Sequence, residues 1–433
     1  MNITEYRTVM NRYEDSERIK QIGPAWTFTN SEFVELGCKR KWSYGYLMNI
    51  ETTEKGDALL YGIVWHVVME HALLRMKNTD TCITKEEALE LIEIVGRKSF
   101  EEEREAIQVI EEAKEEWIEN CLDRMKRAIV GWCDHWAILH KEYEIIAIEQ
   151  TLARPILHPQ TGEIYSPKTY IIEEDDCLYP AGINKERSNL IDVCIPYWKV
   201  GKADAILLKR GTKSLYILDH KTTSQPTSYE RKFLFDMQLS GYCSLLDYEI
   251  KHGDMTYLSK YEVKGVIWDL CHSKVPKPPE PLKSGKLSTA KAKLVPSWIY
   301  EESIIKYELD RSDYEEHLEM LKTKADPNYF CFLITSINEN DMTRSVLEDY
   351  STACSMHELK TKLINADNMT FQYTASRYPI CQQYLSCKYS YLCQPNVAIE
   401  DINETIKHKI YWKKIENNTD YDIINSDQLG LPF

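Results

Sequence analysis

Two short apolar runs on either side of a polar turn form the clearest pattern in the chain. Ala205–Leu208 and Leu215–Leu218 flank the segment Lys209–Lys213, which holds three basic residues, a glycine and a threonine. Short apolar runs around a glycine-containing turn predict the two antiparallel strands of a β-hairpin. The centre of the chain is therefore predicted to be a strand, a tight turn and a second strand.

Charged residues stand where these two strands meet polar sequence. Asp204 precedes the first apolar run, while Asp219 and Lys221 follow the second. Because side chains alternate along a strand, Asp219 and Lys221 are predicted to share one face. Two carboxylates and an amine suit a divalent metal site, since hard oxygen ligands hold Mg²⁺ or Mn²⁺. The alternative is structural, with both carboxylates forming salt bridges to Lys221.

The periodicity of the remaining chain predicts further strands and helices. Strands are predicted at Glu144–Glu149, Lys264–Leu270 and Phe330–Ser336, each a short apolar segment. Helices are predicted at Glu32–Tyr46 with Thr29 or Ser31 as cap, Gly56–Met76, Thr84 to about Leu139, Tyr229–Tyr248 and Leu347–Ile364. Residues 155–198 are polar and rich in turn residues, so we expect an insertion whose acidic run 173–176 is a solvated turn.

Composition bounds the class of protein. The 433 residues are 43% hydrophobic, which suffices for a substantial core. The N-terminus does not resemble a signal peptide and no apolar run reaches membrane length, so we expect a cytoplasmic protein of a bacterium or a phage-infected host, without membrane contact. The net charge of −15 argues against indiscriminate coating of nucleic acid.

One segment departs from this acidic balance. Residues 274–293 contain six lysines and a single acid, with four prolines that keep the segment extended. Lys283, Lys286 and Lys291 are the candidate DNA contacts of this loop. A solvated, flexible loop is an equally good interpretation of the same composition.

The central motif resembles the PD-(D/E)XK nuclease superfamily, in particular its RecB-like branch. The matching residues are Gly201 with Asp204, then Asp219-His220-Lys221-Thr222, and then Gln238 with Tyr242 at helical spacing. The resemblance implies an α/β fold with a restriction-endonuclease-like core, in which helices flank a mixed central β-sheet. It extends over most of a single domain spanning 1–433, with a helical insertion at 77–140 and a peripheral tail at 399–433.

The same resemblance assigns roles to the candidate residues. It implies that His66, four residues after Gly62, binds Mg²⁺ or Mn²⁺ together with Asp204, Asp219 and the main-chain carbonyl of His220. Glu149, at the end of its predicted strand, matches a glutamate at the edge of the metal site. Lys221 would position or activate the attacking water, and Gln238 and Tyr242 would orient the DNA strand. Without the resemblance, His66 would be interpreted as a core histidine.

Cysteines near the two ends of the chain form a second motif. Cys381, Cys387 and Cys393 lie within thirteen residues, and Cys38 lies in the predicted helix Glu32–Tyr46. Four thiolates suit a [4Fe–4S] cluster or a Cys₄ zinc site, and three thiols in a small loop are the structural alternative. The motif resembles iron–sulfur RecB-like nucleases, where the cluster joins the 378–396 segment to the N-terminal helix. This chain has five residues between Cys381 and Cys387, where the family usually has two.

These features predict a metal-dependent deoxyribonuclease. The resemblance implies an exonuclease on DNA ends or single strands in recombination, repair or phage replication, with a recombination or replication protein as a further partner. One alternative is a DNA-binding or scaffold protein that keeps the fold without catalysis. Another is a nuclease of CRISPR spacer acquisition, a family that is generally shorter.

Overall fold

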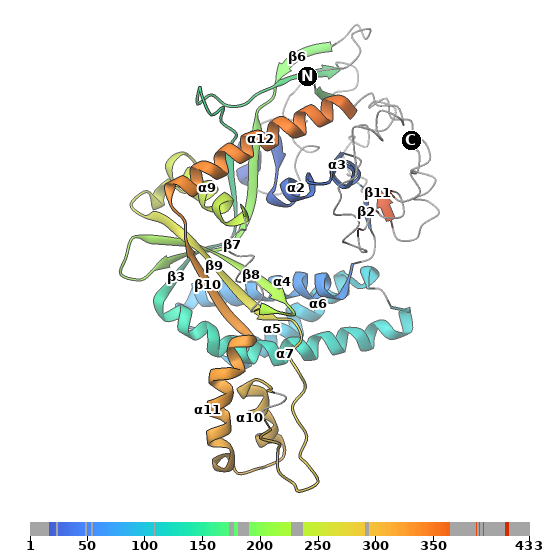
Figure 1. Ribbon diagram of the computed structural model, residues 1–433, viewed down its shortest axis with the longest axis vertical. Coiled ribbons are helices and arrows are strands. Elements are labelled where there is room, and N and C mark those ends of the chain that lie inside the picture. Colours follow the sequence, from blue (N-terminus) through green and yellow to red (C-terminus); the bar gives the residue numbers. More distant parts are fainter. Residues whose placement is uncertain are drawn as a thin grey trace.

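A six-stranded mixed sheet forms the centre of the protein (Figure 1). The computed structural model describes residues 17–22, 25–47, 50–52, 55–107, 109–172, 177–180, 190–226, 237–290, 294–363, 387, 389, 393 and 412–414. The strand order is β1-β7-β8-β9-β10, and β3 pairs with the other edge of β7. The strands are β1 (Trp26–Phe28), β3 (Tyr143–Pro155), β7 (Tyr197–Lys209), β8 (Ser214–Thr223), β9 (Glu262–His272) and β10 (Phe330–Ser336).

The predicted central hairpin is confirmed. β7 and β8 pair antiparallel, with Ala205 opposite Leu218 and Leu208 opposite Leu215. Gly211, in the turn between them, has a φ of +72°, a conformation that glycine adopts without a Cβ penalty. β8 then runs parallel to β9, and β10 returns antiparallel to β9. The expectation of a mixed α/β sheet is confirmed.

Helices cover both faces of this sheet. On one face, α4 (Asp57–Thr79) contacts β3 and β8, while α7 (Glu111–Glu142) contacts β3, β9 and β10. On the other, α9 (Met237–His252) contacts β3, β7 and β9 and packs against α12 (Glu339–Leu363). Figure 1 shows the sheet between these two helical layers.

The α4 helix is apolar because it lies in the core. Among the described helices it alone is long and apolar enough to cross a membrane by length and composition, although the sequence analysis expected no apolar run of that length. Its buried residues include Val64, Trp65 and Val68, which pack in one cluster with Trp132 of α7 and Leu218 of β8. This burial accounts for the apolar sequence.

The helical region predicted from Thr84 is present. Thr84 caps α5 (Lys85–Leu91) in a capping box with Glu87, as the sequence predicts. The π-helical turn η3 (Ile92–Gly96), α6 (Arg97–Glu102) and the 3₁₀ turn η4 (Arg104–Ala106) lead from there to α7. Ile118, Leu122 and other apolar residues of α7 are buried in one cluster with residues of α4 and of the sheet, so this region is part of the core.

The continuous helix predicted over Glu32–Tyr46 is wrong. Thr29 does cap α2 (Asn30–Glu35), accepting a hydrogen bond from the Glu32 N–H. The chain then leaves the helix, and Cys38 has extended backbone angles before α3 (Lys39–Trp42) and the π-helical turn η2 (Ser43–Leu47). Gly37 interrupts the helical periodicity at this point, since glycine lowers helix propensity. Cys38 therefore lies at the N-terminus of α3 instead of inside a helix.

Smaller elements surround the central domain. The polar segment 155–198 contains a three-stranded sheet that the sequence did not predict, with β4 (Lys168–Ile172) between β5 (Cys177–Pro180) and β6 (Leu190–Cys194). The acidic run 173–176 lies outside the described residues. β2 (Ile50–Thr52) pairs with β11 (Trp412–Lys414), so part of the predicted tail contacts the N-terminal region. The remaining short elements are α1 (Glu17–Ile22) and the 3₁₀ turn η5 (Thr256–Leu258).

A helical lobe lies between β9 and β10. It consists of α10 (Ser297–Lys306), η6 (Arg311–Tyr314), α11 (Glu315–Lys324) and η7 (Asp326–Asn328), and it extends below α7 in Figure 1. The lobe has its own cluster of buried residues, including Tyr300, Tyr314 and Leu321. Its Trp298 ring lies directly on Gly131 of α7, where a side chain would leave no room, and this contact fixes the lobe to the core.

Candidate active site

The candidate site lies where β8 separates from β7. Main-chain pairing between the two strands ends at Ala205 and Leu218. At the next position the Asp204 side chain replaces the main chain of β7 as the partner of β8, because its Oδ2 accepts a hydrogen bond from the His220 N–H at 2.7 Å. β1 pairs with β7 farther along the same edge, at Lys199 and before. The stretch of β7 between these two partners carries Gly201 and Asp204.

The α4 helix brings His66 to this point. His66 Nδ1 lies 3.3 Å from Asp204 Oδ2. One turn earlier, Gly62 faces Thr222 of β8, and a Cβ at Gly62 would lie 3.2 Å from the Thr222 Oγ1. The absence of a side chain at Gly62 allows α4 to approach β8 closely, and His66 reaches the aspartate as a result. The sequence spacing Gly62–His66 therefore has a structural basis.

Asp219 and Lys221 lie together on one face of β8. Lys221 Nζ lies 2.8 Å from Asp219 Oδ2 and 2.9 Å from Oδ1, and its well-directed hydrogen bond goes to Oδ1. Asp219 is only 5% exposed. Burial raises the pKa of Asp219, the charge of Asp204 raises it further, and Lys221 opposes both effects. A buried carboxylate at this position is thus poorly stabilised by the chain alone.

The pKa of Asp204 shifts in the opposite direction. Burial would raise it, but the hydrogen bond and charge of His66, together with His220, outweigh burial and lower the pKa of Asp204. In turn, burial would lower the pKa of His66, but Asp204 and Asp219 raise it. The three groups therefore form one electrostatic unit in which each carboxylate influences the others.

Glu149 joins this unit from β3. The neighbouring pairs Ile148–Ala205 and Gln150–Ala203 place Glu149 opposite Asp204 on the adjacent strand. Its carboxylate lies 2.5 Å from Lys202 Nζ, and burial raises its pKa, with Asp204 adding to the effect. Glu149 also has a φ of +50°, which is rare for a non-glycine residue and is typical of functional sites when it occurs inside a strand.

The helix α9 covers the site from the other side. Gln238 Nε2 donates a hydrogen bond to Tyr242 Oη at 3.2 Å, so the predicted pair is in contact. The Tyr242 ring packs on Gly201 of β7, where a Cβ would lie 2.7 Å from the ring. The glycine of the Gly-x-x-Asp motif therefore makes room for the tyrosine of the Gln-x-x-x-Tyr motif.

The sequence analysis missed a buried polar cluster on the opposite face of the sheet. The His220 side chain points away from Asp219, and its Nδ1 lies 2.9 Å from Asp269 Oδ2. Trp132 donates its indole N–H to the same oxygen at 2.8 Å, and His135 lies 3.6 Å from the other oxygen. Burial would raise the pKa of Asp269, but the hydrogen bond from His220 and the nearby His135 imidazole lower it well below its usual range. The signal was an acid inside the apolar strand Lys264–Leu270.

We call the point where β8 separates from β7 the fork. The donor set at this fork fits a divalent cation. It offers the carboxylates of Asp204, Asp219 and Glu149, the His66 imidazole, and one Asp219 oxygen with lone-pair capacity beyond the hydrogen bond to Oδ1. Within the part of the chain that the structure describes, no three His, Cys, Asp or Glu side chains are grouped as a preformed metal site. In the arrangement seen, Lys221 and His66 neutralise the two aspartates.

The described cysteines of the second motif lie near one another. Burial raises the pKa of Cys387, and the nearby thiols of Cys38 and Cys393 raise it further. Tyr389 lies between Cys387 and Cys393 in sequence, and its ring contacts the Tyr44 ring at a centroid distance of 5.4 Å. Cys381, the fourth predicted ligand, lies outside the described residues. These contacts connect the C-terminal segment with the N-terminal helices.

The three predicted DNA-contacting lysines belong to the connection between β9 and α10. Lys283 and Lys286 are exposed there, and Lys286 pairs with Asp313 of the helical lobe at 3.2 Å. Lys291 lies outside the described residues. The structure therefore does not bring Lys283 and Lys286 to the fork of β7 and β8, and the role of all three lysines in binding DNA stays a prediction.

Comparison with known proteins identifies the class to which this geometry belongs. The family model described as the PD-(D/E)XK nuclease superfamily matches residues 34–394, which include every residue of the fork. No curated protein matches the chain.

Proposed function

Because the chain belongs to the PD-(D/E)XK nuclease superfamily, we propose that it is a metal-dependent DNA nuclease, with its active site at the fork of β7 and β8. The observation that carries the proposal is the placement of two carboxylates, the half-buried Asp204 and the buried Asp219, beside Lys221 at the point where the strands separate. A fold need not keep a function, but this chain retains the chemistry of the site as well as the fold.

The residues of the fork would have different roles in phosphodiester hydrolysis. Asp204, Asp219, Glu149, His66 and the His220 carbonyl would hold Mg²⁺ or Mn²⁺, which lowers the pKa of a bound water and neutralises phosphate charge. Lys221 presents its ammonium beside Asp219, where it can orient the attacking water and stabilise charge that develops on the phosphate. Tyr242 of α9 packs on Gly201 of β7 and accepts a hydrogen bond from Gln238, and this pair would position the DNA backbone.

The finer assignment follows the RecB-like motif order. We propose action as an exonuclease on DNA ends or single strands, in recombination, repair or phage replication, in a cytoplasmic setting and with a replication or recombination protein as partner. The alternatives are a catalytically silent DNA-binding protein and a nuclease of CRISPR spacer acquisition. Intact Asp204, Asp219 and Lys221 favour catalysis over the silent alternative.

A cleavage assay on end-labelled single- and double-stranded DNA tests the proposal. With Mg²⁺ or Mn²⁺, we expect cleavage that Lys221→Ala and Asp219→Asn each slow by about 10²–10⁴-fold. Lys251→Ala is the matched control, since Lys251 lies on the exposed side of α9 and pairs with Asp247. Equal cleavage by the variants would place the active site elsewhere. Absence of cleavage by the wild-type protein on every substrate would favour the silent alternative.

We also propose that Cys38, Cys387, Cys393 and Cys381 hold a [4Fe–4S] cluster, with a Cys₄ zinc site as the alternative. The support is the proximity of Cys387 to Cys38 and Cys393 together with the pairing of β2 and β11. Metal analysis and the absorption spectrum of protein purified without oxygen test this assignment. Brown protein with iron supports the cluster, zinc without colour supports the alternative, and neither metal would leave the thiols structural.

A further inference from the structure

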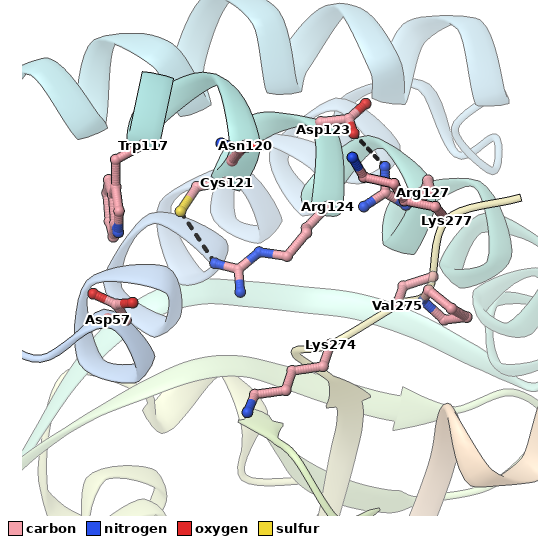
Figure 2. A pocket seen from close by; sticks show the side chains of 11 residues that line it. Asp57, Trp117, Asn120, Cys121, Asp123, Arg124, Arg127, Lys274, Val275 and Lys277 are labelled. Atoms are coloured by element: carbon pink, nitrogen blue, oxygen red, sulfur yellow. Dashed lines mark hydrogen bonds and ion pairs between the residues drawn. The ribbon is translucent and has the colours of Figure 1, made fainter. Parts of the chain in front are cut away.

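A basic pocket lies on the face of the sheet that α4 and α7 cover, and none of its lining residues belongs to the fork. Its volume is about 480 Å³. Figure 2 shows that its walls come from α7, the N-terminus of α4 and the chain that follows β9. Four cationic side chains line it, and they are Arg124, Arg127, Lys274 and Lys277. In a chain with a net charge of −15, this concentration of positive charge requires an explanation.

The positive charge of the pocket is only partly neutralised. Two carboxylates, Asp57 and Asp123, also line it, and Asp123 already pairs with Arg127. Lys274 and Lys277 are exposed, and within the described part of the chain neither forms an ion pair. The pocket therefore keeps two positive charges in excess.

The arginines of α7 have donor capacity in reserve. Arg127 is only 8% exposed, and its buried Nε has no hydrogen-bond partner among the described residues. The buried Nε of Arg124 is likewise without one in the same part of the chain. Buried donors without an acceptor are costly, and they are common where a ligand supplies the missing acceptor.

The contacts of Arg124 do not neutralise it. Its Nη2 donates to the Cys121 Sγ at 3.1 Å (Figure 2), and its guanidinium lies 5.1 Å from the Tyr61 ring centroid. Burial raises the pKa of Cys121, so this sulfur stays a neutral thiol and a weak acceptor. The guanidinium is thus oriented by its neighbours while its charge stays available to an anion.

The pocket begins close to the active-site strand. The Ser273 N–H donates to the carbonyl of Thr223 at 2.9 Å, and Thr223 is the last residue of β8, two residues after Lys221. Lys274, the next residue after Ser273, therefore leaves the sheet beside the end of β8. On α4, Asp57 of the pocket and His66 of the fork are nine residues apart, which is about 14 Å along a helix. That distance corresponds to roughly four nucleotides of a B-form strand.

We propose that this pocket binds a backbone phosphate of the nucleic-acid substrate, a few nucleotides from the bond that is cleaved. The arginine donors and the two lysines match phosphate oxygens, and Trp117 at the rim of the pocket offers a surface on which a base can stack. The inference rests on the proposed nuclease function, to which it adds a contact outside the catalytic residues.

Binding without metal tests the site separately from cleavage. The probe is a short, fluorescently labelled single-stranded oligonucleotide, measured by anisotropy in EDTA over a series of salt concentrations. We expect Arg124→Gln, and separately Lys274→Ala with Lys277→Ala, to raise the Kd about tenfold and to flatten the salt dependence by about 0.7 per lost phosphate contact. The lysine variant changes only exposed side chains, so it guards against loss of the fold.

Two control variants remove the same charge elsewhere. Lys126→Gln lies on the same helix as Arg124 but pairs with Glu93, and Lys306→Ala with Lys324→Ala removes two exposed lysines of the lobe. If both control proteins bind the oligonucleotide as the wild-type protein does while the pocket variants bind it weakly, the inference stands. Equal Kd values for pocket and control variants, or no binding by the wild-type protein, would overturn it.

The cleavage assay then separates this inference from the proposed function. If the pocket holds substrate phosphate, its variants raise KM with little change in kcat. If the wild-type protein binds DNA through the pocket but cleaves none, the proposed nuclease function fails and the phosphate site remains. If the wild-type protein cleaves DNA and the pocket variants show an unchanged KM and Kd, the nuclease function stands and the phosphate site is wrong.

Discussion

The ring of Tyr242 occupies the space that a side chain at position 201 would need. A Cβ on Gly201 would lie 2.7 Å from the Tyr242 Cε1 and 3.1 Å from the Leu245 Cδ1. This contact joins β7, which carries Asp204, to α9, which carries Gln238. Two motifs that are separated by about forty residues in sequence are therefore one packing unit.

Gly201→Ala should displace Tyr242 from the site. We expect a loss of about 1–3 kcal/mol in unfolding free energy from overpacking, together with reduced DNA cleavage. Urea unfolding and the cleavage rate measure the two effects. Gly56→Ala is the control, since no atom lies within 4 Å of a Cβ at that position. A Gly201→Ala protein with wild-type stability and rate would show that the contact is dispensable.

The two aspartates of the fork should respond oppositely to neutralisation in metal-free protein. Burial raises the pKa of Asp219, so its folded form binds protons more tightly, and its stability contribution is lost as the pH rises through that pKa. The lowered pKa of Asp204 gives a contribution that is present at neutral pH and lost in acid. At pH 7, Asp219→Asn should therefore stabilise the protein and Asp204→Asn should destabilise it.

Urea unfolding in EDTA at pH 7 and at about pH 3.5, near the unfolded pKa of aspartate, checks this pair of predictions. Both differences should shrink at the lower pH, where the unfolded carboxyl groups become protonated. A destabilising Asp219→Asn substitution at pH 7 would mean that the ion pair with Lys221 outweighs the cost of burial.

Removal of Asp349 should be costly for the fold. Asp349 of α12 lies 2.5 Å from Arg154 Nη2 and 2.7 Å from Lys199 Nζ, and all three side chains are buried. Asp349→Ala leaves two buried cations without their carboxylate, and we expect a loss of about 3–5 kcal/mol in unfolding free energy. Glu358→Gln on the exposed face of α12 should change it by less than about 1 kcal/mol. Similar unfolding curves for the two variants would refute the argument.

His66 should determine how much metal the enzyme needs. Chelation should abolish cleavage, and Mg²⁺ or Mn²⁺ should restore it. His66→Ala should raise the metal concentration for half-maximal activity about tenfold or more, because it removes a proposed ligand that also contacts Asp204. His71→Ala is the matched control, since its Nδ1 bonds the Val67 carbonyl on the exposed side of α4. An unchanged metal requirement in His66→Ala would exclude His66 as a ligand.

The sequence predicted the sheet, with Asp204, Asp219 and Lys221 at its fork, because their signals are local. The other members of the fork were predicted only from the family resemblance. Apolar runs mark β7 and β8, and the residues at their ends alternate in a way that places Asp219 beside Lys221. The role of Gly62 and Gly201 in close packing could not be derived in this way, because the side chains they accommodate, Thr222 and Tyr242, come from distant segments.

Tertiary contacts also explain what the sequence analysis missed. The partners of Asp269 are Trp132 and His135 on α7, and only the packing of that helix on the sheet brings them together. The sequence analysis assigned no role to the arginines of the basic pocket, because they belong to a long predicted helix. Their exposure to a pocket depends on where the chain after β9 runs, which a helical pattern does not encode.

The helical lobe has a consequence for how such an enzyme can diversify. The chain leaves the sheet at His272 and returns at Phe330, and Phe330 lies directly opposite Cys271. In topological terms the whole lobe is the loop of a β-hairpin, so it can be lengthened, exchanged or trimmed without altering the register of any strand. The lobe has its own buried cluster, and Trp298 and Ile299 anchor it to the core, so a replacement that keeps these two contacts can leave the hydrolytic centre unchanged.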